Sequence, residues 1–469
     1  MTDAVSVPAW LLVLLAALAV WALYEHVLVP ALRFLYTHPA NQVIDELGER
    51  LRIGIRPFQR TKRQALIHSL LTDRRVQAAA EQYAKDKDLS LPAALRRVER
   101  YAREIVPAFN AYLYFRIGYW IGRWIARSLY RVRIGYLDSE GIARVGSDAT
   151  VVFVMNHRSN MDYVLTAYLA ADQAALSYAV GEWARLWPLS ALIRAMGAYF
   201  VRRNSKDELY RRVLERYIAM ATEAGVPQAV FPEGGLTRDG RMREPRLGVI
   251  DYMMRGFRIE GERDLVFVPL GINYDRVLED RSLLRALDPD APRSGTASAL
   301  WNTFAFVAHN LRLMLKSEWH RFGYACVNFG SPISMRAYCR DRGVDFQKLS
   351  GEERKRETAA LGARLMEAVG RVVPVVPGPL MATVFVGNPE RRFSSLELKA
   401  EVEQLLGRLE RSAAHVYVPR HDLDYALDVG LRMLPMRHLV DEHEGVYIAR
   451  EREMPLLRYY ANSIAHLLD

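Results

Sequence analysis

A histidine and an aspartate five positions apart lie in the segment NHRSNMD, residues 156–162, which directly follows a short apolar run. On one continuous helix, His157 and Asp162 would point in quite different directions. If instead His157 lies in a turn and a helix begins near Met161, the Asp162 carboxylate can fold back onto the imidazole. One ring nitrogen would then be oriented by the acid, and the other could take a proton from an alcohol. The alternative is a capped helix whose histidine has no chemical role.

A pair of arginines follows a second apolar run, GAYFV at 197–201. The run reads as a strand, so Arg202 and Arg203 point to opposite faces and only one of them can contact a given ligand. The pair indicates a site for an anion. The alternative is an arginine pair on the surface with no ligand.

A third segment, FPEGGLTR at 231–238, again stands where a predicted strand ends. Its two glycines let backbone N–H groups approach an anion closely, and Thr237 and Arg238 add a hydroxyl and a guanidinium. A plain glycine turn is the alternative. A fourth segment, VPLGI at 268–272, reads as a strand with an internal proline, which is unusual for a central strand.

Taken in order, these four segments resemble the motifs of the glycerolipid acyltransferase superfamily. The HRSxMDY wording, the double arginine after GAYFV and the EGG-x-T/S-R block resemble the bacterial and mitochondrial glycerol-3-phosphate acyltransferase family. The motifs of the sister lysophosphatidate acyltransferases typically read NHxSxxD and FPEGTRS. Asn156 and the FP pair at 231–232 match these motifs more closely. Near the C-terminus, LLRYYANSI at 456–464 also looks like the former family, so the resemblance covers roughly residues 130–469.

The resemblance implies roles for individual residues. His157 would be the general base and Asp162 its orienting partner. Arg203 would be the first choice for holding the glycerol phosphate, because the sister family's arginine matches the second of the pair, and Pro269 would shape the acyl side. The substrate-binding residues that the resemblance implies are Arg158, Ser159, Arg202, Arg203, Glu233, Gly234, Gly235, Thr237, Arg238 and Pro269.

The implied activity is transfer of a fatty acyl group from acyl-CoA or acyl carrier protein to the sn-1 hydroxyl of glycerol 3-phosphate, which gives lysophosphatidic acid. This is the first step of phospholipid synthesis and needs no cofactor beyond the acyl donor. However, Leu236 stands where the family usually has arginine. A missing guanidinium removes a contact worth about 1.5–3 kcal/mol. Lysophosphatidate and dihydroxyacetone phosphate therefore stay open as acceptors, and a non-catalytic, membrane-tethered protein that binds lipid or acyl carrier is the alternative from another class.

The elements that must position these residues alternate between strands and helices. Apolar runs at 150–155, 197–201, 228–231, 265–270 and 325–329 read as buried strands, and 162–174, 207–224 and 247–256 read as helices. Such alternation predicts an α/β domain with a mixed, mostly parallel sheet flanked by helices. Before it, residues 64–87 are helix-like, and Ser90 reads as the cap of a further helix. After it come a polar insertion at 280–296 and a long helix at 301–319.

The N-terminus predicts a membrane anchor. Residues 7–24 contain no charged side chain and are close to the length that crosses a bilayer, while arginines and lysines follow from Arg33 onward. Because only Asp3 is charged before the run, a cleaved signal peptide fits less well. Residues 105–130 read either as an interfacial helix with apolar and arginine-bearing sides or as a helix packed on the core. We expect attachment to the inner (cytoplasmic) membrane, with the catalytic domain facing the cytosol.

The composition of the chain indicates which kinds of ligand and partner it can bind. A net charge of +10 favours anionic partners such as phosphorylated substrates and an anionic leaflet. Only two cysteines occur, outside any CxxC pair, and no HExxH spacing is present, so neither a disulfide framework nor a metal site is expected. Helices and a hairpin at 438–450 predict a small winged-helix-like shape, but the helix at 396–410 carries four Glu against one Lys and one Arg, so no nucleic-acid partner is expected.

The predicted organisation has four parts. A membrane anchor occupies residues 1–37 and a helical and interfacial region occupies 38–130. The acyltransferase domain occupies 131–335, and a mostly helical region follows at 336–469, with a Pro- and Val-rich hinge at 372–379.

Overall fold

The computed structural model describes residues 56–170, 175–181, 189–202, 205–288 and 322–468, together with the single residues Leu18, Trp21 and Glu25. Within these ranges no helix combines the length and the apolar character needed to cross a bilayer. The predicted anchor at 1–37, apart from those three single residues, and the predicted helix at 301–319 lie outside the described residues.

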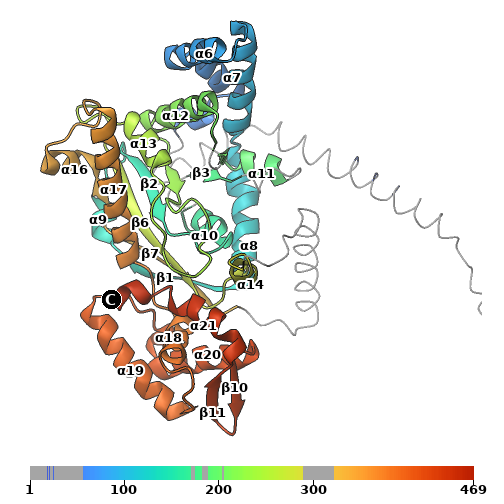
Figure 1. Ribbon diagram of the computed structural model, residues 1–469, viewed down its shortest axis with the longest axis vertical. Helices are drawn as coiled ribbons and strands as arrows, with labels where there is room; N and C mark the ends of the chain where they lie inside the picture. Colours follow the sequence, from blue (N-terminus) through green and yellow to red (C-terminus); the bar gives the residue numbers. More distant parts are fainter. Residues whose placement is uncertain are drawn as a thin grey trace, which may run out of the picture.

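The centre of the described chain is a sheet in the order β1-β7-β6-β2-β5-β3-β4, with β8 paired to β6 (Figure 1). Its pairings are parallel except those of β6 with β7 and with β8. The mixed, mostly parallel sheet flanked by helices is therefore confirmed. The strands are β1 (Arg131–Leu137), β2 (Thr150–Met155), β3 (Ser177–Val180), β4 (Tyr199–Phe200), β5 (Gln228–Val230), β6 (Leu265–Tyr274), β7 (Tyr324–Phe329) and β8 (Ile333–Ser334).

Strand β2 lies at the centre of the sheet, between β5 and β6, and all six of its residues are buried. Its valines and phenylalanine suit a strand covered on both faces, because β-branched and aromatic side chains pack well on a pleated surface. The segment 156–162 begins where β2 ends. It therefore lies at the carboxyl ends of the parallel strands, where open α/β sheets place their sites.

Pro269 lies inside the central strand β6, opposite Val154 of β2. On the other side of β6, Val266 and Phe267 pair with β8, and pairing with β7 begins only at Leu270. Pro269 thus occupies the position where the second partner changes, so a residue without an N–H group is tolerated there.

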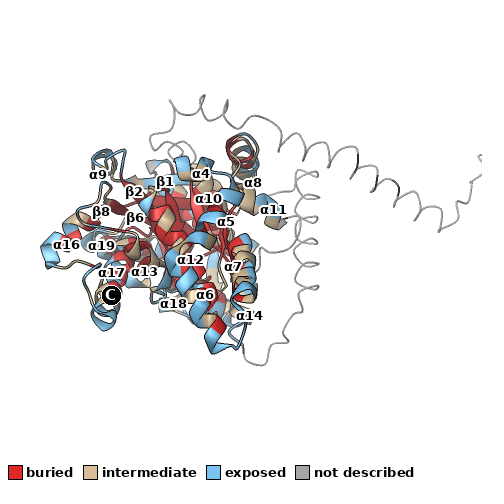
Figure 2. Ribbon diagram, turned by 90° about the horizontal axis from the view of Figure 1, so that it is seen from above, coloured by how far each residue is buried: buried red, intermediate tan, exposed pale blue. Residues whose placement is uncertain are grey.

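The two faces of the sheet carry two apolar cores. Val151 and Phe153 pack against α8, α10 and the C-terminal helices, whereas Val152 and Val154 pack against α7, α12, α13 and α17. In Figure 2 the buried strands lie in the middle and the helices around them expose their outer sides. The predicted helices at 207–224 and 247–256 are confirmed, and that at 162–174 is present as far as residue 170. The bounds are α7 (Leu91–Ile105), α8 (Tyr119–Leu129), α10 (Met161–Ala170), α12 (Glu208–Glu223), α13 (Gly248–Arg255) and α17 (Gly351–Arg371).

The helix-like stretch at 64–87 is helical but divides into two helices. The chain forms α5 (Arg63–Thr72) and α6 (Arg74–Asp86), because the Asp73 carboxylate accepts the backbone N–H groups of Arg75 and Val76 and so caps a new helix. The predicted start at Ser90 is correct, although the Ser90 side chain makes no capping hydrogen bond.

Residues 105–130 form a π-helix and an α-helix that pack one side on the core, as the second alternative predicted. The π-helix η2 (Leu113–Gly118) and α8 bury one side, including Tyr114 and Ala126, and α8 packs on α10. The other side of α8 exposes 59% of Trp120, 48% of Ile121 and 59% of Trp124. The first part of the predicted polar insertion at 280–296 forms the helix α14 (Asp280–Arg285).

The C-terminal part lies below the sheet in Figure 1, and its helices belong to the same apolar core as one face of the sheet. The predicted hairpin is present as β10 and β11, with β9 as the third strand of a small antiparallel sheet. The order helix, short strand, helix, helix, hairpin is compatible with the expected winged-helix-like shape. The elements are α18 (Pro377–Gly387), β9 (Phe393–Ser394), α19 (Ser395–Arg411), α20 (Leu423–Met436), β10 (Val440–His443), β11 (Val446–Ala449) and α21 (Met454–Ala461).

Candidate active site

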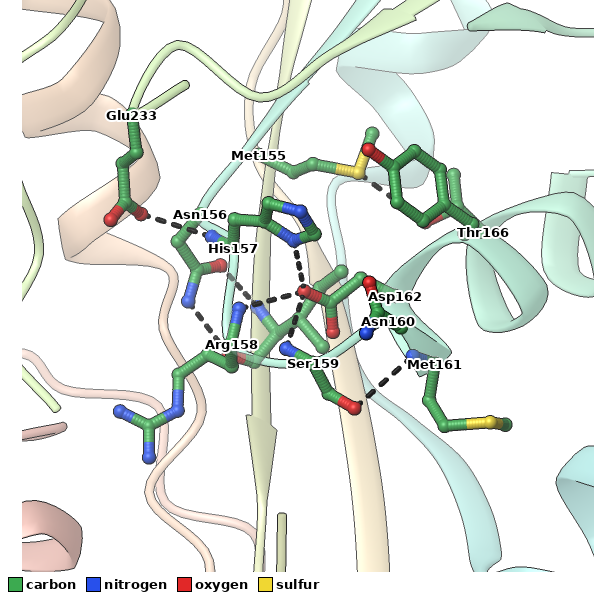
Figure 3. A network of polar contacts seen from close by, with 12 residues as sticks. Met155, Asn156, His157, Arg158, Ser159, Asn160, Met161, Asp162, Thr166 and Glu233 are labelled. Atoms are coloured by element: carbon green, nitrogen blue, oxygen red, sulfur yellow. Dashed lines mark hydrogen bonds and ion pairs between the residues drawn. The ribbon is translucent and has the colours of Figure 1, made fainter. Parts of the chain in front are cut away.

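The side chains of His157 and Asp162 meet in the turn between β2 and α10 (Figure 3). The His157 Nδ1 atom lies 2.9 Å from Asp162 Oδ2, and both side chains are buried. Asp162 belongs to the first turn of α10, as the sequence analysis expected, so its carboxylate reaches back over the turn. The second ring nitrogen of His157 points away from Asp162, and His157 lines a cavity.

Asp162 is held by hydrogen-bond donors from its own turn and from strand β6. Its Oδ2 atom also accepts the backbone N–H groups of Arg158 (2.7 Å) and Ser159 (3.0 Å). Its Oδ1 atom accepts the hydroxyl of Tyr274 at 2.5 Å, from the end of the adjacent strand β6. Burial raises the pKa of Tyr274 well above its ordinary value, so the hydroxyl stays a donor. Four donors thus fix the orientation of the Asp162 carboxylate.

Three further contacts fix the backbone of the turn. The Asn156 amide spans to β6, donating to the Ile272 carbonyl (2.9 Å) and accepting its N–H (2.8 Å). The His157 N–H donates to Glu233 Oε1 at 2.9 Å, and the His157 carbonyl accepts the Thr237 N–H at 3.1 Å. The turn is therefore tied to both the neighbouring strand and the glycine-rich segment.

The Glu233 carboxylate is buried and also accepts the Arg243 N–H at 3.2 Å. Burial raises the pKa of Glu233 to about 7. Glu279 plays a similar part on the other side of the turn. It accepts the Ser159 hydroxyl (2.8 Å) and both nitrogens of Asn160 (3.0 and 3.1 Å), and burial raises its pKa. Both carboxylates hold the turn in place.

The cavity beside His157 has a volume of about 260 Å³. The His157 ring is stacked on Phe231, with ring centroids 4.1 Å apart, and meets Tyr163 edge-on at 5.3 Å. Gly234 and Gly235 line the same cavity, as the sequence analysis expected for the glycine turn. The cavity's apolar wall consists of Val180, Val201, Leu214, Val230, Val249 and Ile250.

Three arginines line this cavity: Arg202, Arg211 and Arg246. Arg202 is already engaged, since Glu104 accepts its Nε at 2.8 Å and its Nη2 at 2.5 Å. Arg246 lies over the glycine turn, so that a Cβ added to Gly234 would come within 2.5 Å of its Cδ atom. Arg211 lies in the first turns of α12.

The sequence analysis missed Arg211 and Arg246. Both lie at the beginning of a helix whose N-terminal end faces the carboxyl edge of the sheet, α12 for Arg211 and α13 for Arg246. Helix starts at that edge are a usual position for groups that bind anions, and this is the signal that would have found them.

Several predicted substrate residues lie elsewhere. The Arg158 guanidinium points away from the cavity, donating to the Gly240 carbonyl (2.7 Å) and lying 4.9 Å from the Tyr459 ring centre. Ser159 is bonded to Glu279, and Pro269 is inside the sheet, where its carbonyl accepts the Gly330 N–H. Neither they nor Arg158 line the cavity, so these three predictions are corrected.

Two polar residues of the glycine-rich segment also turn away from the cavity. The Thr237 hydroxyl donates to the Arg241 carbonyl at 2.6 Å, and the exposed Arg238 contacts the Ala286 carbonyl at 3.4 Å. The turn uses its own polar side chains to close its backbone, so they are not available at the cavity. Arg203, the first choice for the phosphate, lies outside the described residues.

In the described part of the chain, no three His, Cys, Asp or Glu side chains are grouped as a metal ion would require. Cys326 and Cys339 are buried and free. Burial raises the pKa of Cys326 to about 12 and that of Cys339 to about 11.

Comparisons with known proteins show what the chain is similar to. A family model described as acyltransferase matches residues 137–273, and one described as glycerol-3-phosphate acyltransferase C-terminal region matches 310–468. The glycerol-3-phosphate acyltransferases of Aeromonas hydrophila subsp. hydrophila and Haemophilus ducreyi are each 26% identical to this chain. Each match covers 92% of this chain and 52% of the relative, so the chain spans about half the length of the curated relatives it matches.

Among solved structures, the 1-acyl-sn-glycerophosphate acyltransferase of Thermotoga maritima matches 54% of this chain and 77% of its own, with 16% identity and a TM-score of 0.30. The two family models follow one another along the sequence, and between them they contain the turn with His157, the glycine-rich segment and the C-terminal helices. Over most of its length the chain is thus similar to glycerol-3-phosphate acyltransferases.

Proposed function

We propose that the protein transfers a fatty acyl group from a thioester, acyl-CoA or acyl carrier protein, to the sn-1 hydroxyl of glycerol 3-phosphate. The product is lysophosphatidic acid, made in the first step of phospholipid synthesis. The observation that carries the proposal is the opening of the His157–Asp162 pair onto a cavity lined by three arginines. The names of the relatives point to the same acceptor.

The reaction needs no covalent enzyme intermediate. The free ring nitrogen of His157 takes the proton of the acceptor hydroxyl, and the oxygen attacks the thioester carbonyl. A carbon–oxygen bond forms, the tetrahedral intermediate collapses, and the carbon–sulfur bond breaks. The sulfur leaves with the proton that the imidazolium returns. Asp162, oriented by its four donors, keeps the Nδ1 proton in place and stabilises the imidazolium.

The arginines that line the cavity bind and orient the acceptor. Arg211 and Arg246 bind the phosphate, and Arg202 adds a positive charge that Glu104 partly compensates. Two guanidinium groups beside the base hold the hydroxyl in attack geometry, which converts a bimolecular encounter into an oriented one. They also supply charge in the region where Leu236 replaces the arginine usual in the family.

Two alternatives are separated by one assay. The purified full chain is offered labelled acyl-CoA with glycerol 3-phosphate, lysophosphatidate or dihydroxyacetone phosphate. We expect the highest kcat/KM with glycerol 3-phosphate, and a higher value with another acceptor would reassign the substrate. Turnover with none of them would favour a protein that binds lipid or acyl carrier without chemistry.

His157→Ala tests the base. Activity should fall to background while the fold persists, because the ring packs against Phe231 without holding the backbone. His443→Ala on the exposed hairpin is the matched control and should keep full activity. Retained turnover in His157→Ala would remove His157 from the mechanism.

We further propose that the protein acts on the cytosolic surface of the inner membrane. The apolar run at 7–24 supports attachment, and the exposed face of α8 with Trp120, Ile121 and Trp124 supports contact with lipid. Arg116, Arg123 and Arg127 of the same segment suit anionic headgroups. Because α8 packs on α10, lipid contact would place the membrane next to the helix that carries Asp162.

Nitroxide labels test this placement. Trp124→Cys and Leu396→Cys each put a label at an exposed position, the second one on α19. In vesicles that contain phosphatidylglycerol, the label at 124 should be more accessible to oxygen than to a water-soluble nickel chelate, and the label at 396 should show the reverse. A label at 124 that prefers the nickel chelate would exclude α8 from the membrane.

A further inference from the structure

A second and larger cavity, of about 880 Å³, lies at the far edge of the sheet. Strands β1 and β7 form one wall, and the segment 414–425 between α19 and α20 forms the other. It shares no lining residue with the cavity of His157. Its volume is in the range of cavities that hold small molecules, and a lone phosphate would fill little of it.

The cavity is positively charged. Arg131, Arg133 and Arg420 line it, and no Asp or Glu is among the described residues that do. None of the three forms an ion pair with a carboxylate in the described part of the chain. The Arg131 guanidinium lies 5.6 Å from the Tyr324 ring centre, and that of Arg420 lies 4.1 Å from the Tyr425 ring centre. Arg131 Nη1 also donates to the Tyr425 hydroxyl at 3.2 Å and Arg133 Nη1 to the Val132 carbonyl at 3.0 Å, so each keeps further N–H groups for an anion.

The walls also offer aromatic surfaces. Tyr136 and His415 are stacked, with centroids 4.0 Å apart and ring planes 15° apart. Tyr324 and Tyr417 contact each other across the cavity wall at 5.3 Å. Burial lowers the pKa of His415, so the ring is neutral at pH 7 and adds no charge to the site. A planar ring can stack on such walls, as nucleobases do on aromatic side chains.

One buried donor in the wall has no partner. Asn328 is fully buried, and its Oδ1 atom accepts the Tyr136 N–H at 2.7 Å, which fixes the amide orientation. Its Nδ2 atom then lacks a hydrogen-bond partner, although Asn328 lines the cavity. An orphaned buried donor costs about 1–3 kcal/mol unless a ligand or water accepts from it. Arg420 at the rim has a left-handed backbone, with φ of 60°, which is uncommon for a residue other than glycine.

We propose that this cavity binds a nucleoside phosphate. The arginines hold the phosphate, the stacked rings receive the base, and Asn328 Nδ2 donates to an acceptor on the ligand. The ligand can be a free nucleotide or the phosphoadenosine end of coenzyme A, and only the second source rests on the proposed function. Three cations without carboxylate partners, a planar aromatic wall and an orphaned donor fit this ligand better than a lipid headgroup, which has no ring.

Isothermal titration calorimetry on the purified full chain tests the proposal with ADP, coenzyme A and inorganic phosphate as probes. We expect ADP or coenzyme A to bind at least tenfold more tightly than phosphate. Coenzyme A tighter than ADP identifies the donor as the source, and the reverse identifies a free nucleotide. Equal affinity for all three probes would overturn the proposal.

Charge reversal assigns the binding to this cavity. Arg133→Glu and Arg420→Glu should each weaken the tighter probe at least tenfold, whereas Arg432→Glu, an exposed arginine on α20, should not. The series is repeated with His157→Ala, in which the acyl-transfer reaction is removed. Binding that persists there separates this inference from the proposed function. Affinity unchanged in both reversal variants would overturn the inference, and thermal melting confirms that each variant is folded.

Discussion

The two turns that form the site, 156–162 and 231–238, obtain their function in different ways. In the first, both reacting side chains lie within the turn. The Asp162 carboxylate accepts hydrogen bonds from the backbone N–H groups of Arg158 and Ser159 and from one side chain of the neighbouring strand. In the second, Thr237 and Arg238 turn away, and the cavity takes its cations from the starts of α12 and α13. Proton transfer needs hydrogen-bond geometry, which a short segment can encode. Coulombic attraction acts over a longer range, so any element around the cavity can supply it.

Among the changes that compare the two turns, Asp162→Asn should reduce kcat the most, because it disrupts the hydrogen bonds within the first turn. An amide cannot accept from all four donors, and its NH₂ group would face one of them. We expect kcat to fall on the order of 10³–10⁴-fold, as for an orienting carboxylate that loses its charge. Initial-rate kinetics measure the loss, and Asp148→Asn at an exposed position is the matched control. A fall of less than tenfold would mean that Asp162 has no part in orienting the base.

Arg246→Ala sharpens the contrast at the second turn. Loss of one charge-assisted contact of about 1.5–3 kcal/mol predicts a KM for glycerol 3-phosphate that rises roughly tenfold to a hundredfold, with kcat little changed. Arg238→Ala, which removes the arginine that the motif itself supplies, should change KM less than threefold because Arg238 does not line the cavity. The opposite ranking would place the phosphate on the outer side of the glycine turn.

Glu233→Gln gives the smallest effect, on stability. The folded-state pKa of Glu233 is raised to about 7, so its stabilising contribution is complete at low pH and is lost as pH rises toward and through 7. Relative to wild type, Glu233→Gln should therefore gain about 1–3 kcal/mol of unfolding free energy between pH 5 and pH 8. Urea denaturation of both proteins at pH 5, 6.5 and 8 measures the difference in unfolding free energy. The pKa of Asp275 is also raised, but its contribution is the same in both proteins and cancels in the difference. A difference that does not change with pH would show that Glu233 is ionised throughout this range.

Much of the fold could be predicted because its signals are local. The apolar runs at 150–155 and 265–270 are buried strands, and the cap at Ser90 begins a helix. The break at Asp73 was missed because helical periodicity continues across it, and only the carboxylate's contact with two N–H groups reveals it.

The site was predictable only in part, for the same reason. His157 and Asp162 lie in one short turn, so their spacing was informative. Arg246, Tyr274 and Glu279 reach the site from elements far along the chain, and a single sequence carries no signal for such pairings. The expected roles of Arg158 and Ser159 came from the family resemblance. Neighbouring residues in a turn point in different directions, and these two point away from the cavity.

The contact of α21 with the catalytic loops has a consequence for biosynthesis. Arg158 lies on the Tyr459 ring, Asn462 donates to the Asp239 carbonyl at 2.8 Å, and a Cβ at Gly240 would meet the Tyr459 carbonyl oxygen at 1.9 Å. These partners leave the ribosome some 220 to 300 residues after the loops that they cover, since Tyr459 follows Gly240 and Arg158 by that distance. The nascent chain therefore cannot form these contacts until α21 has been translated, and until then the loops that contain Arg158 and Gly240 lack this cover.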